Sequence, residues 1–254
     1  MIIDCHGHGS ISGRFKLTVD MLIDSLDRYG IDKLCISAPL TAKDAAPKEI
    51  REANDDVLGA VRLHPDRLMG YCFVNPGFAA AAQEEITRCV AGEGMIGLKL
   101  YHQYKMNDPV QFPVIERTIE LGVPILMHAG FAATPETRED QPNLATGEQF
   151  ADVAARYPEA MLICGHIGGG GDWERQLKGL RRARTVYLDT SGSVGDAGMI
   201  ERCARELGVE RLLFGCDMSV ERGLAKIRDA ALTAHQRERI FSGNFLSILR
   251  RRRK

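Results

Sequence analysis

The stretch MIIDCHGH, residues 1–8, is typical of a buried strand whose carboxyl end carries polar side chains. Side chains alternate between the two faces of an extended chain, so Asp4, His6 and His8 are expected on one face, with Cys5 and Gly7 on the other. Two imidazoles on one face suggest a metal site. A hydrogen-bonded structural role for such a histidine is the alternative, and the rest of the chain decides between the two.

Seven further strand-like runs follow the first, at residues 33–37, 68–74, 95–101, 124–130, 160–166, 185–191 and 211–217. Segments of helical period lie between them, for example residues 79–94, 109–122, 147–158 and 197–208, and several end at a glycine or just before a proline. Eight such units of about 32 residues predict one (β/α)8 TIM barrel spanning residues 1–254, with a doubly wound open sheet as the competing fold. The segment after the eighth run is expected to be helical throughout.

The composition indicates a cytoplasmic protein. The formal charge is −1, with 33 Lys plus Arg against 34 Asp plus Glu, so no global field favours nucleic acid or an anionic membrane. The 7 cysteines are odd in number and form no CxxC pair, which is typical of reduced thiols. No apolar segment approaches the roughly 20 residues that span a bilayer. The sequence leaves open whether the chain forms a homo-oligomer.

Unexpected polar residues gather at the carboxyl ends of the predicted strands, where a TIM barrel has its active site. They are His6, His8, Lys99, His128, His166, Asp189 and Asp217. Strand parity predicts that Cys5 and Cys216 face the helices and that Cys164 faces the barrel interior. Histidines with a carboxylate and no thiolate suit Zn²⁺, Mn²⁺ or Fe²⁺, with one position free for water.

An ordered set of motifs covers nearly the whole chain: DCHGH, LHPDRLMGYCFVNP, GLKLY, ILMHAG, ICGHIGGG, VYLDTSG, LLFGCD and GNFLSIL. This set resembles the amidohydrolase superfamily, in particular the amidohydrolase-related group that also holds the aminocarboxymuconate semialdehyde decarboxylase-like enzymes. The resemblance implies a (β/α)8 barrel in which His6, His8, His128 and Asp217 surround one divalent metal ion, with His166 beside the metal-bound water.

Two motifs depart from the family pattern. The chain has GCDMSV where relatives often read GSDxP, and KLYH where they often read KLHP, which displaces His102 by one position. Both departures lie in substrate-facing loops, so the substrate cannot be carried over from the resemblance.

Asp217 and His166 are the predicted catalytic residues. Zinc is the first choice of metal, and it lowers the pKa of its bound water to about 7. Asp217 would take the proton of this water and later hand it to a leaving group. His166 would orient the nucleophile or stabilise the oxyanion, and its alternative is a satisfied core histidine.

Lys99 has two interpretations. In binuclear relatives a lysine at this place is carbamylated and bridges two metals, whereas a plain ammonium would bind a substrate carboxylate; the second interpretation is favoured here. His102 and Arg14 are further candidate substrate contacts. Asp4 is expected to form hydrogen bonds within the barrel or to brace a ligand, and Asp189 is also expected to support a ligand.

The predicted function is that of a metal-dependent hydrolase acting on a small ester, lactone or amide through a metal-activated water. The alternative is a non-hydrolytic decarboxylase or hydratase of an unsaturated carboxylic acid on the same metal site. A non-catalytic metal-binding barrel is disfavoured, because structural zinc sites are usually closed by four protein ligands. The expected partner is a small molecule, anionic if Lys99 binds it.

Overall fold

Eight parallel strands form the centre of the computed structural model, which describes residues 1–12, 18–132, 134–167, 169 and 171–252. They are β1 (Ile3–His8), β2 (Lys33–Ser37), β3 (Leu68–Phe73), β4 (Gly97–Leu100), β5 (Ile125–Met127), β6 (Leu162–Cys164), β7 (Tyr187–Asp189) and β8 (Leu212–Leu213). Each strand lies inside its predicted run.

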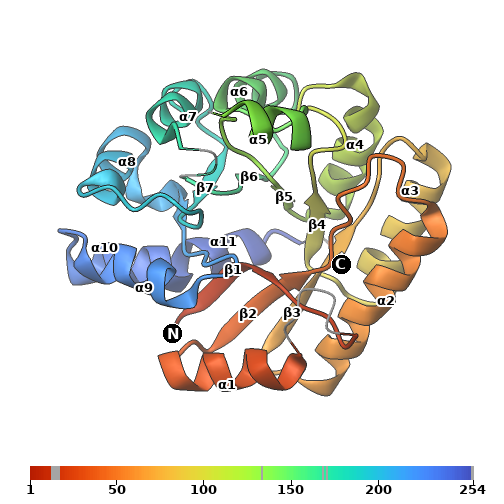
Figure 1. Cartoon of the computed structure of the whole chain (residues 1–254), viewed down its shortest axis with the longest axis horizontal. Coiled ribbons are helices and arrows are strands. Elements are labelled where there is room, and N and C mark those ends of the chain that lie inside the picture. Colours follow the sequence, from red (N-terminus) through yellow and green to blue (C-terminus); the bar gives the residue numbers. More distant parts are fainter. Residues whose placement is uncertain (13–17, 133, 168, 170, 253–254) are drawn as a thin grey trace.

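The strands pair in sequence order from β1 to β8, and Figure 1 shows them as a ring with helices outside it. The ring closes because the Cys5 N–H donates to the carbonyl of Phe214, at 2.9 Å, and the Asp217 N–H donates to that of His6, at 2.7 Å. This arrangement confirms the predicted TIM barrel and excludes the open sheet.

Helices follow the strands and cover the outside of the barrel. They are α1 (Val19–Tyr29), α2 (Pro47–Leu63), α3 (Ala79–Ile86), α4 (Phe112–Leu121), α5 (Pro135–Asp140), α6 (Gly147–Arg156), α7 (Trp173–Leu180), α8 (Met199–Leu207), α9 (Val220–Asp229), α10 (Ala234–Glu238) and α11 (Asn244–Leu249). Short 3₁₀ or π segments adjoin them: η1 (Thr87–Gly92), η2 (Pro109–Gln111), η3 (Val209–Arg211) and η4 (Arg239–Gly243). The predicted helical segments and the helical character after β8 are confirmed. Among the described residues, no helix is long and apolar enough to cross a membrane.

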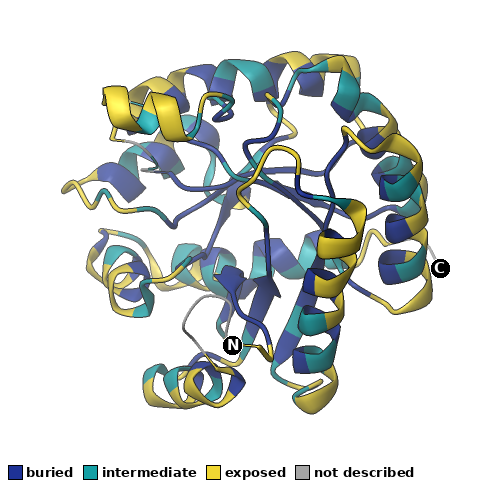
Figure 2. Cartoon of the chain, turned by 45° about the vertical axis from the view of Figure 1, so that its right-hand side comes forward, coloured by how far each residue is buried: buried dark blue, intermediate teal, exposed yellow. Residues whose placement is uncertain are grey.

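The apolar core has two main layers and a small third cluster of Ala45, Ile50 and Phe73, and Figure 2 shows the buried strands inside helices whose outer faces are exposed. The larger layer lies between strands and helices. The smaller fills the barrel interior and includes Ile3, Cys5, Cys35, Tyr71, Leu126, Ile163 and Leu213, together with Phe245 and Ile248 of α11. Because apolar side chains and α11 fill the amino end of the interior, the polar site is confined to the carboxyl end.

A bulge in β1 overturns the predicted alternation. Asp4 pairs with Leu34 and Gly7 with Ile36, so Cys5 and His6 together oppose one residue of β2. Such a bulge directs both side chains to one face: Cys5 joins the interior cluster and His6 points into the site above it. The predictions that Cys5 faces the helices and that Asp4 shares the face of His6 are therefore wrong.

The parity prediction is also wrong for Cys164 and correct for Cys216. Cys164 belongs to the outer core, where the Gln176 amide of α7 lies 3.0 Å from its Sγ. Cys216 packs against α9, because a Cβ added at Gly223 would lie 2.4 Å from its Sγ. Cys164 and His166 face different ways because the extended chain ends at Cys164 and the backbone turns at His166.

Candidate metal centre

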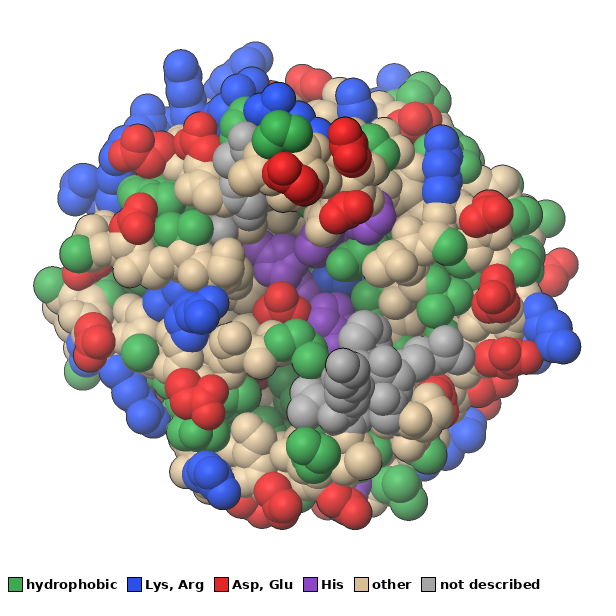
Figure 3. All heavy atoms as spheres, in the orientation of Figure 1, with side chains coloured by type: hydrophobic (Ala, Val, Ile, Leu, Met, Phe, Trp, Pro, Cys, Tyr) green, Lys and Arg blue, Asp and Glu red, His purple; other side chains and the backbone are tan. Residues whose placement is uncertain are grey.

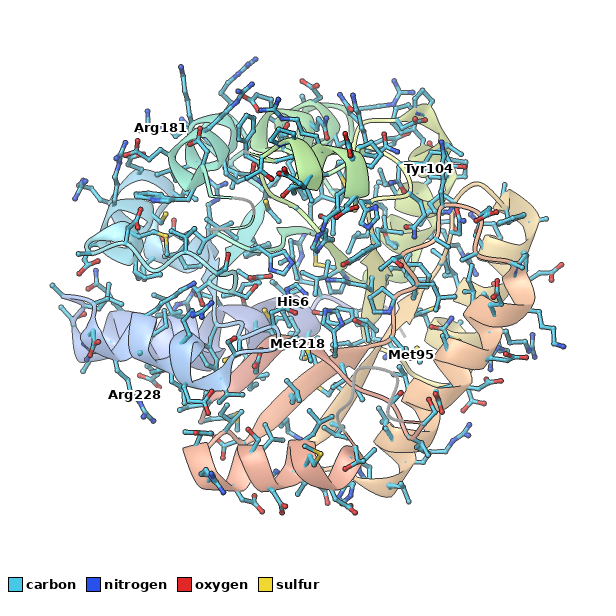
Figure 4. The ribbon with its side chains drawn as sticks, in the orientation of Figure 1. His6, Met95, Tyr104, Arg181, Met218 and Arg228 are labelled. Atoms are coloured by element: carbon cyan, nitrogen blue, oxygen red, sulfur yellow. The ribbon has the colours of Figure 1, made fainter. Side chains whose placement is uncertain are left out.

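Histidine side chains gather in a hollow at the middle of the face shown in Figure 3, with an acidic side chain beside them. Figure 4 places His6 at the centre of the molecule and Tyr104 at its rim. The residues predicted from the strand ends are indeed neighbours here: His6, His8, Lys99, His128, His166, Asp189 and Asp217. All of them are buried except His128 and Asp217, which are partly exposed.

His6 is held between a carboxylate and an ammonium group. Its Nδ1 lies 2.8 Å from Asp189 Oδ2, and its Nε2 lies 2.7 Å from Lys99 Nζ. Although burial raises the pKa of Asp189, the nearby His6 lowers it further, so the net pKa is well below the usual range. An ionised Asp189 accepts the proton of Nδ1, and the lone pair of Nε2 is therefore directed into the site.

His8 and Asp217 complete a group of three potential metal ligands. His8 Nδ1 lies 3.3 Å from the Ser37 carbonyl, and His8 Nε2 lies 3.1 Å from Asp217 Oδ1. One ligand atom each from His6, His8 and Asp217 lies within 4.8 Å of the others. Burial raises the pKa of Asp217, but the hydrogen bond from His8 and the nearby histidines lower it more, so the carboxyl is ionised.

His128 and His166 lie beside this group and contact each other. His166 Nε2 lies 2.9 Å from His128 Nδ1, and His166 Nδ1 lies 2.9 Å from the Ser191 hydroxyl. Burial lowers the pKa of His166 to about 3 and that of His128 well below its ordinary value, so both rings are neutral at pH 7. The geometric group of three does not include His128, whose role as a fourth ligand stays a prediction.

Gln141 is a residue that sequence reasoning missed. Its Oε1 lies 2.9 Å from His128 Nε2, so it accepts the proton of that nitrogen, and the lone pair of His128 is then on Nδ1, the nitrogen beside His166. Tyr101 was also missed, and its ring lies 4.2 Å from that of His128. Gln141 lies in no predicted strand, so no sequence signal marks it. Tyr101 is the last residue of the predicted strand at residues 95–101, and this position is the signal that could have identified it.

The backbone is strained at the two predicted catalytic residues. Among the described residues, His166 (φ 63°) and Asp217 (φ 57°) are the only non-glycine residues with positive φ. This left-handed conformation is uncommon outside glycine and is often found at functional sites. The Asp189 carboxylate accepts the N–H of His166, at 3.1 Å, and the His6 carbonyl accepts that of Asp217, so both strained turns are tied to the site itself.

Two glycines make room for the pair formed by His6 and Asp189. A Cβ at Gly165 would lie 2.7 Å from the Met127 carbonyl and 3.4 Å from the ring of His6, and one at Gly215 would lie 3.2 Å from the Cβ of His6. A side chain at either position would displace the pair.

Lys99 is fully buried and lies nearest to His6. Burial lowers its pKa to about 8, while Asp217 and Asp189 oppose the change. No carboxylate among the described residues forms a direct ion pair with it, and its nearest polar partner is His6 Nε2.

The remaining predicted residues are placed as follows. His102 is buried in the mouth, with its ring 4.6 Å from Tyr101 and 6.0 Å from His128. Asp4 accepts the N–H groups of His6 and Cys216, at 3.0 and 3.1 Å, and so ties β1 to the turn after β8. Arg14 lies outside the described residues.

The donor set fits a divalent metal ion. Two imidazole nitrogens and one ionised carboxylate converge, and the other nitrogen of each imidazole is bonded to Asp189 or to Ser37, which is how histidines are commonly held when they bind metal. Nitrogen and oxygen donors without sulfur suit Zn²⁺, Mn²⁺ or Fe²⁺.

Comparison with known proteins identifies a family and several solved structures of the same fold. Residues 3–251 match the model of the family described as amidohydrolase. A 4-oxalomesaconate hydratase from Rhodopseudomonas palustris is 18% identical, with a TM-score of 0.75 over 99% of this chain and 96% of that one. A 2,6-dihydroxybenzoate decarboxylase from Rhizobium is 16% identical, with a TM-score of 0.77 over 98% of both chains. A 5-carboxyvanillate decarboxylase from Novosphingobium aromaticivorans, complexed with manganese and 4-hydroxy-3-methoxy-5-nitrobenzoic acid, is 17% identical, with a TM-score of 0.75 over 98% of this chain and 96% of that one.

Proposed function

The chain belongs to the amidohydrolase family, and we propose that it is a metal-dependent enzyme that decarboxylates a small aromatic or unsaturated carboxylic acid. The observation that carries the proposal is the buried ammonium of Lys99, which forms no direct ion pair among the described residues and adjoins the potential metal ligands. A buried charge of this kind is costly unless an ion of opposite sign compensates it, and a substrate carboxylate is such an ion.

His6, His8 and Asp217 would hold the metal ion, with His128 as the fourth ligand through Nδ1. The ion would supply Lewis acidity, polarising an oxygen atom of the substrate. Manganese in one of the similar solved structures supports Mn²⁺ beside Zn²⁺ as the ion.

Asp217 would move the proton. Its carboxyl is ionised at rest because His8 and the other histidines lower its pKa, so it first accepts a proton, from the substrate or from water. It then returns the proton to the carbon that loses CO₂. Neutral His166, fixed by Ser191, would orient the substrate from the β6 side.

The names of the similar structures support decarboxylation over hydrolysis, since they include decarboxylases and a hydratase. Their identity to this chain is 16–18%, so they share its fold and the reaction is carried over as a proposal. Hydrolysis of a small ester, lactone or amide is the second candidate, and the family match favours it.

The test is a substrate screen with the metal-loaded protein. Hydroxybenzoates and unsaturated carboxylic acids are incubated in D₂O, and released CO₂ and incorporated deuterium are measured beside hydrolysis of lactones, esters and amides. Decarboxylation predicts one CO₂ and one deuterium on carbon per turnover. Turnover of an ester or lactone without CO₂ would assign the chain to the hydrolases instead. The Asp217→Asn variant controls for contaminating activity.

A further inference from the structure

A cavity of about 320 Å³ opens at the amino end of the barrel, beside the amino ends of β6, β7 and β8 and the helix α11. Its lining includes four arginines: Arg184, Arg211, Arg239 and Arg251. The histidines and Lys99 lie at the carboxyl ends of the strands, so this cavity is at the other end of the barrel from the candidate metal centre.

Arg211 is the buried member of this arginine cavity. It is 8% exposed, and it donates to the carbonyl of Val186 through Nε, at 2.7 Å, and to that of Leu180 through Nη2, at 3.1 Å. Both acceptors are neutral. Burial lowers the pKa of the Arg211 guanidinium and the nearby Glu210 opposes this change, but no carboxylate among the described residues forms a direct ion pair with it. Burying an ion without a counterion costs on the order of several kcal/mol of folding free energy unless another charge compensates it.

The charges around the cavity are not balanced either. No ion pair of the four arginines is found within the part of the chain that the structure describes, whereas Arg181 and Arg202, which lie outside it, both pair with Glu206. Among the described residues that line the cavity, Glu210 is the one acidic residue. Its carboxylate lies against the backbone of Gly208, where an added Cβ would come within 2.8 Å of both oxygens.

We propose that the arginine cavity binds the phosphate group of a small organic phosphate. The planar guanidinium fork matches phosphate oxygens with two parallel hydrogen bonds, and several forks around one cavity favour a multiply charged anion. The hydroxyl-bearing Thr185 and Tyr187 also line the cavity. Its volume lies at the lower end of the range for small-molecule sites. This site is independent of the proposed function.

The test is isothermal titration of inorganic phosphate and glycerol phosphate into the full-length, metal-loaded protein in a chloride buffer. We expect one site per chain, with both ligands bound more tightly than sulfate at equal ionic strength. Arg184→Gln and Arg239→Gln should each weaken binding at least about fivefold, because each removes one charged fork. Arg182→Gln is the matched control: it removes an exposed arginine two residues from Arg184 that does not line the cavity, and binding should be unchanged.

Three outcomes would overturn the proposal. One is the absence of heat up to about 10 mM ligand, well beyond a millimolar dissociation constant. A second is binding that does not depend on the cavity, seen either as equal affinity of wild type, Arg184→Gln and Arg239→Gln or as loss of binding in Lys99→Met. Either result would show that the anion binds at the metal centre or elsewhere. The third is preference for a short oligonucleotide over glycerol phosphate, which would indicate a nucleic-acid surface. The Arg211→Gln variant extends the test to the buried arginine of the cavity, and circular dichroism checks that this variant is folded.

Discussion

At the residue scale, the strained backbone of Asp217 and His166 is the clearest mark of function. A left-handed residue costs of order 1–3 kcal/mol and persists where its surroundings hold it. Here the carbonyl of His6 and the carboxylate of Asp189 hold the two turns, and both groups belong to the candidate metal centre. The strain thus aims both side chains at the hollow.

Asp217→Asn is expected to fold normally and to lose about 10²–10⁴ in turnover, because the amide cannot accept the proton. Asparagine tolerates the left-handed conformation, so the substitution isolates the chemistry from the strain. Turnover and metal content are measured together. Near wild-type turnover in a metal-loaded variant would remove Asp217 from the mechanism.

Deprotonation of Lys99 is expected to lower the activity of the enzyme at alkaline pH. Its pKa is lowered to about 8 by burial, and a metal ion nearby would lower it further. The ammonium binds an anionic substrate below this pKa, and binding is lost as pH rises through it. The profile of kcat/KM should therefore fall with an apparent pKa at or below about 8.

The control for this loss of activity is Lys99→Met, which should retain its metal, bind a carboxylate substrate poorly and lack the alkaline limb. A limb of unchanged position in Lys99→Met would assign it to another group. Intact mass should also show an unmodified lysine and, with it, one metal ion per chain, because without a carbamate no anion bridges two dications. An added carboxyl group on Lys99, or two metals, would contradict this.

At the element scale, α6 and α7 approach each other through glycines. A Cβ at Gly147 would lie 2.2 Å from the Gln176 carbonyl, and one at Gly179 would lie 2.4 Å from the Glu148 nitrogen. The Gly147 N–H donates to the Gln176 side chain at 2.9 Å, and the same Gln176 contacts Cys164 of β6. This contact fixes the two helices that flank β6, the strand leading to His166.

Gly179→Ala is expected to destabilise the fold by about 1–3 kcal/mol, because the clash is with backbone and overpacking forces the helices apart. Gly92→Ala is the matched control, since its nearest neighbour to an added Cβ is 3.7 Å away and alanine favours helical backbone. Urea denaturation measures both variants. Equal stability of the two variants would show that the close approach of α6 and α7 does not restrict the size of the side chain at Gly179.

At the scale of the whole molecule, the candidate metal centre is built from residues far apart in the sequence. His6 and His8 lie in β1, Asp217 follows β8, and Lys99 lies in β4. Because the potential ligands lie near the two ends of the chain, they come together only in the closed barrel. A ligand that binds the folded state alone stabilises it by mass action.

Removing the metal with a chelator should therefore lower the melting temperature, and adding Mn²⁺ or Zn²⁺ should restore it. At roughly 100 times the dissociation constant the ion contributes about 2.7 kcal/mol, or about 5–10 °C for a domain of this size. His6→Ala should have lost most of this response while keeping the circular dichroism of the barrel. An identical metal-dependent shift in His6→Ala would exclude that residue as a ligand.

The sequence by itself determined the barrel and the neighbourhood of the site. The rhythm of strand and helix predicted the fold because β-type runs and helical periods are local properties of the chain. His6, His8, Lys99, His128, His166, Asp189 and Asp217 came together as predicted, because parallel strands in one barrel bring their carboxyl ends to one face.

Only the tertiary structure decided which way individual side chains point. The bulge that turns Cys5 inward depends on the register between β1 and β2, and the reversal at His166 depends on a carboxylate 23 residues away in the chain. Gln141 reaches His128, and four arginines surround one cavity, because segments distant in sequence pack together. Register and packing are long-range properties, and no local pattern of residues records them.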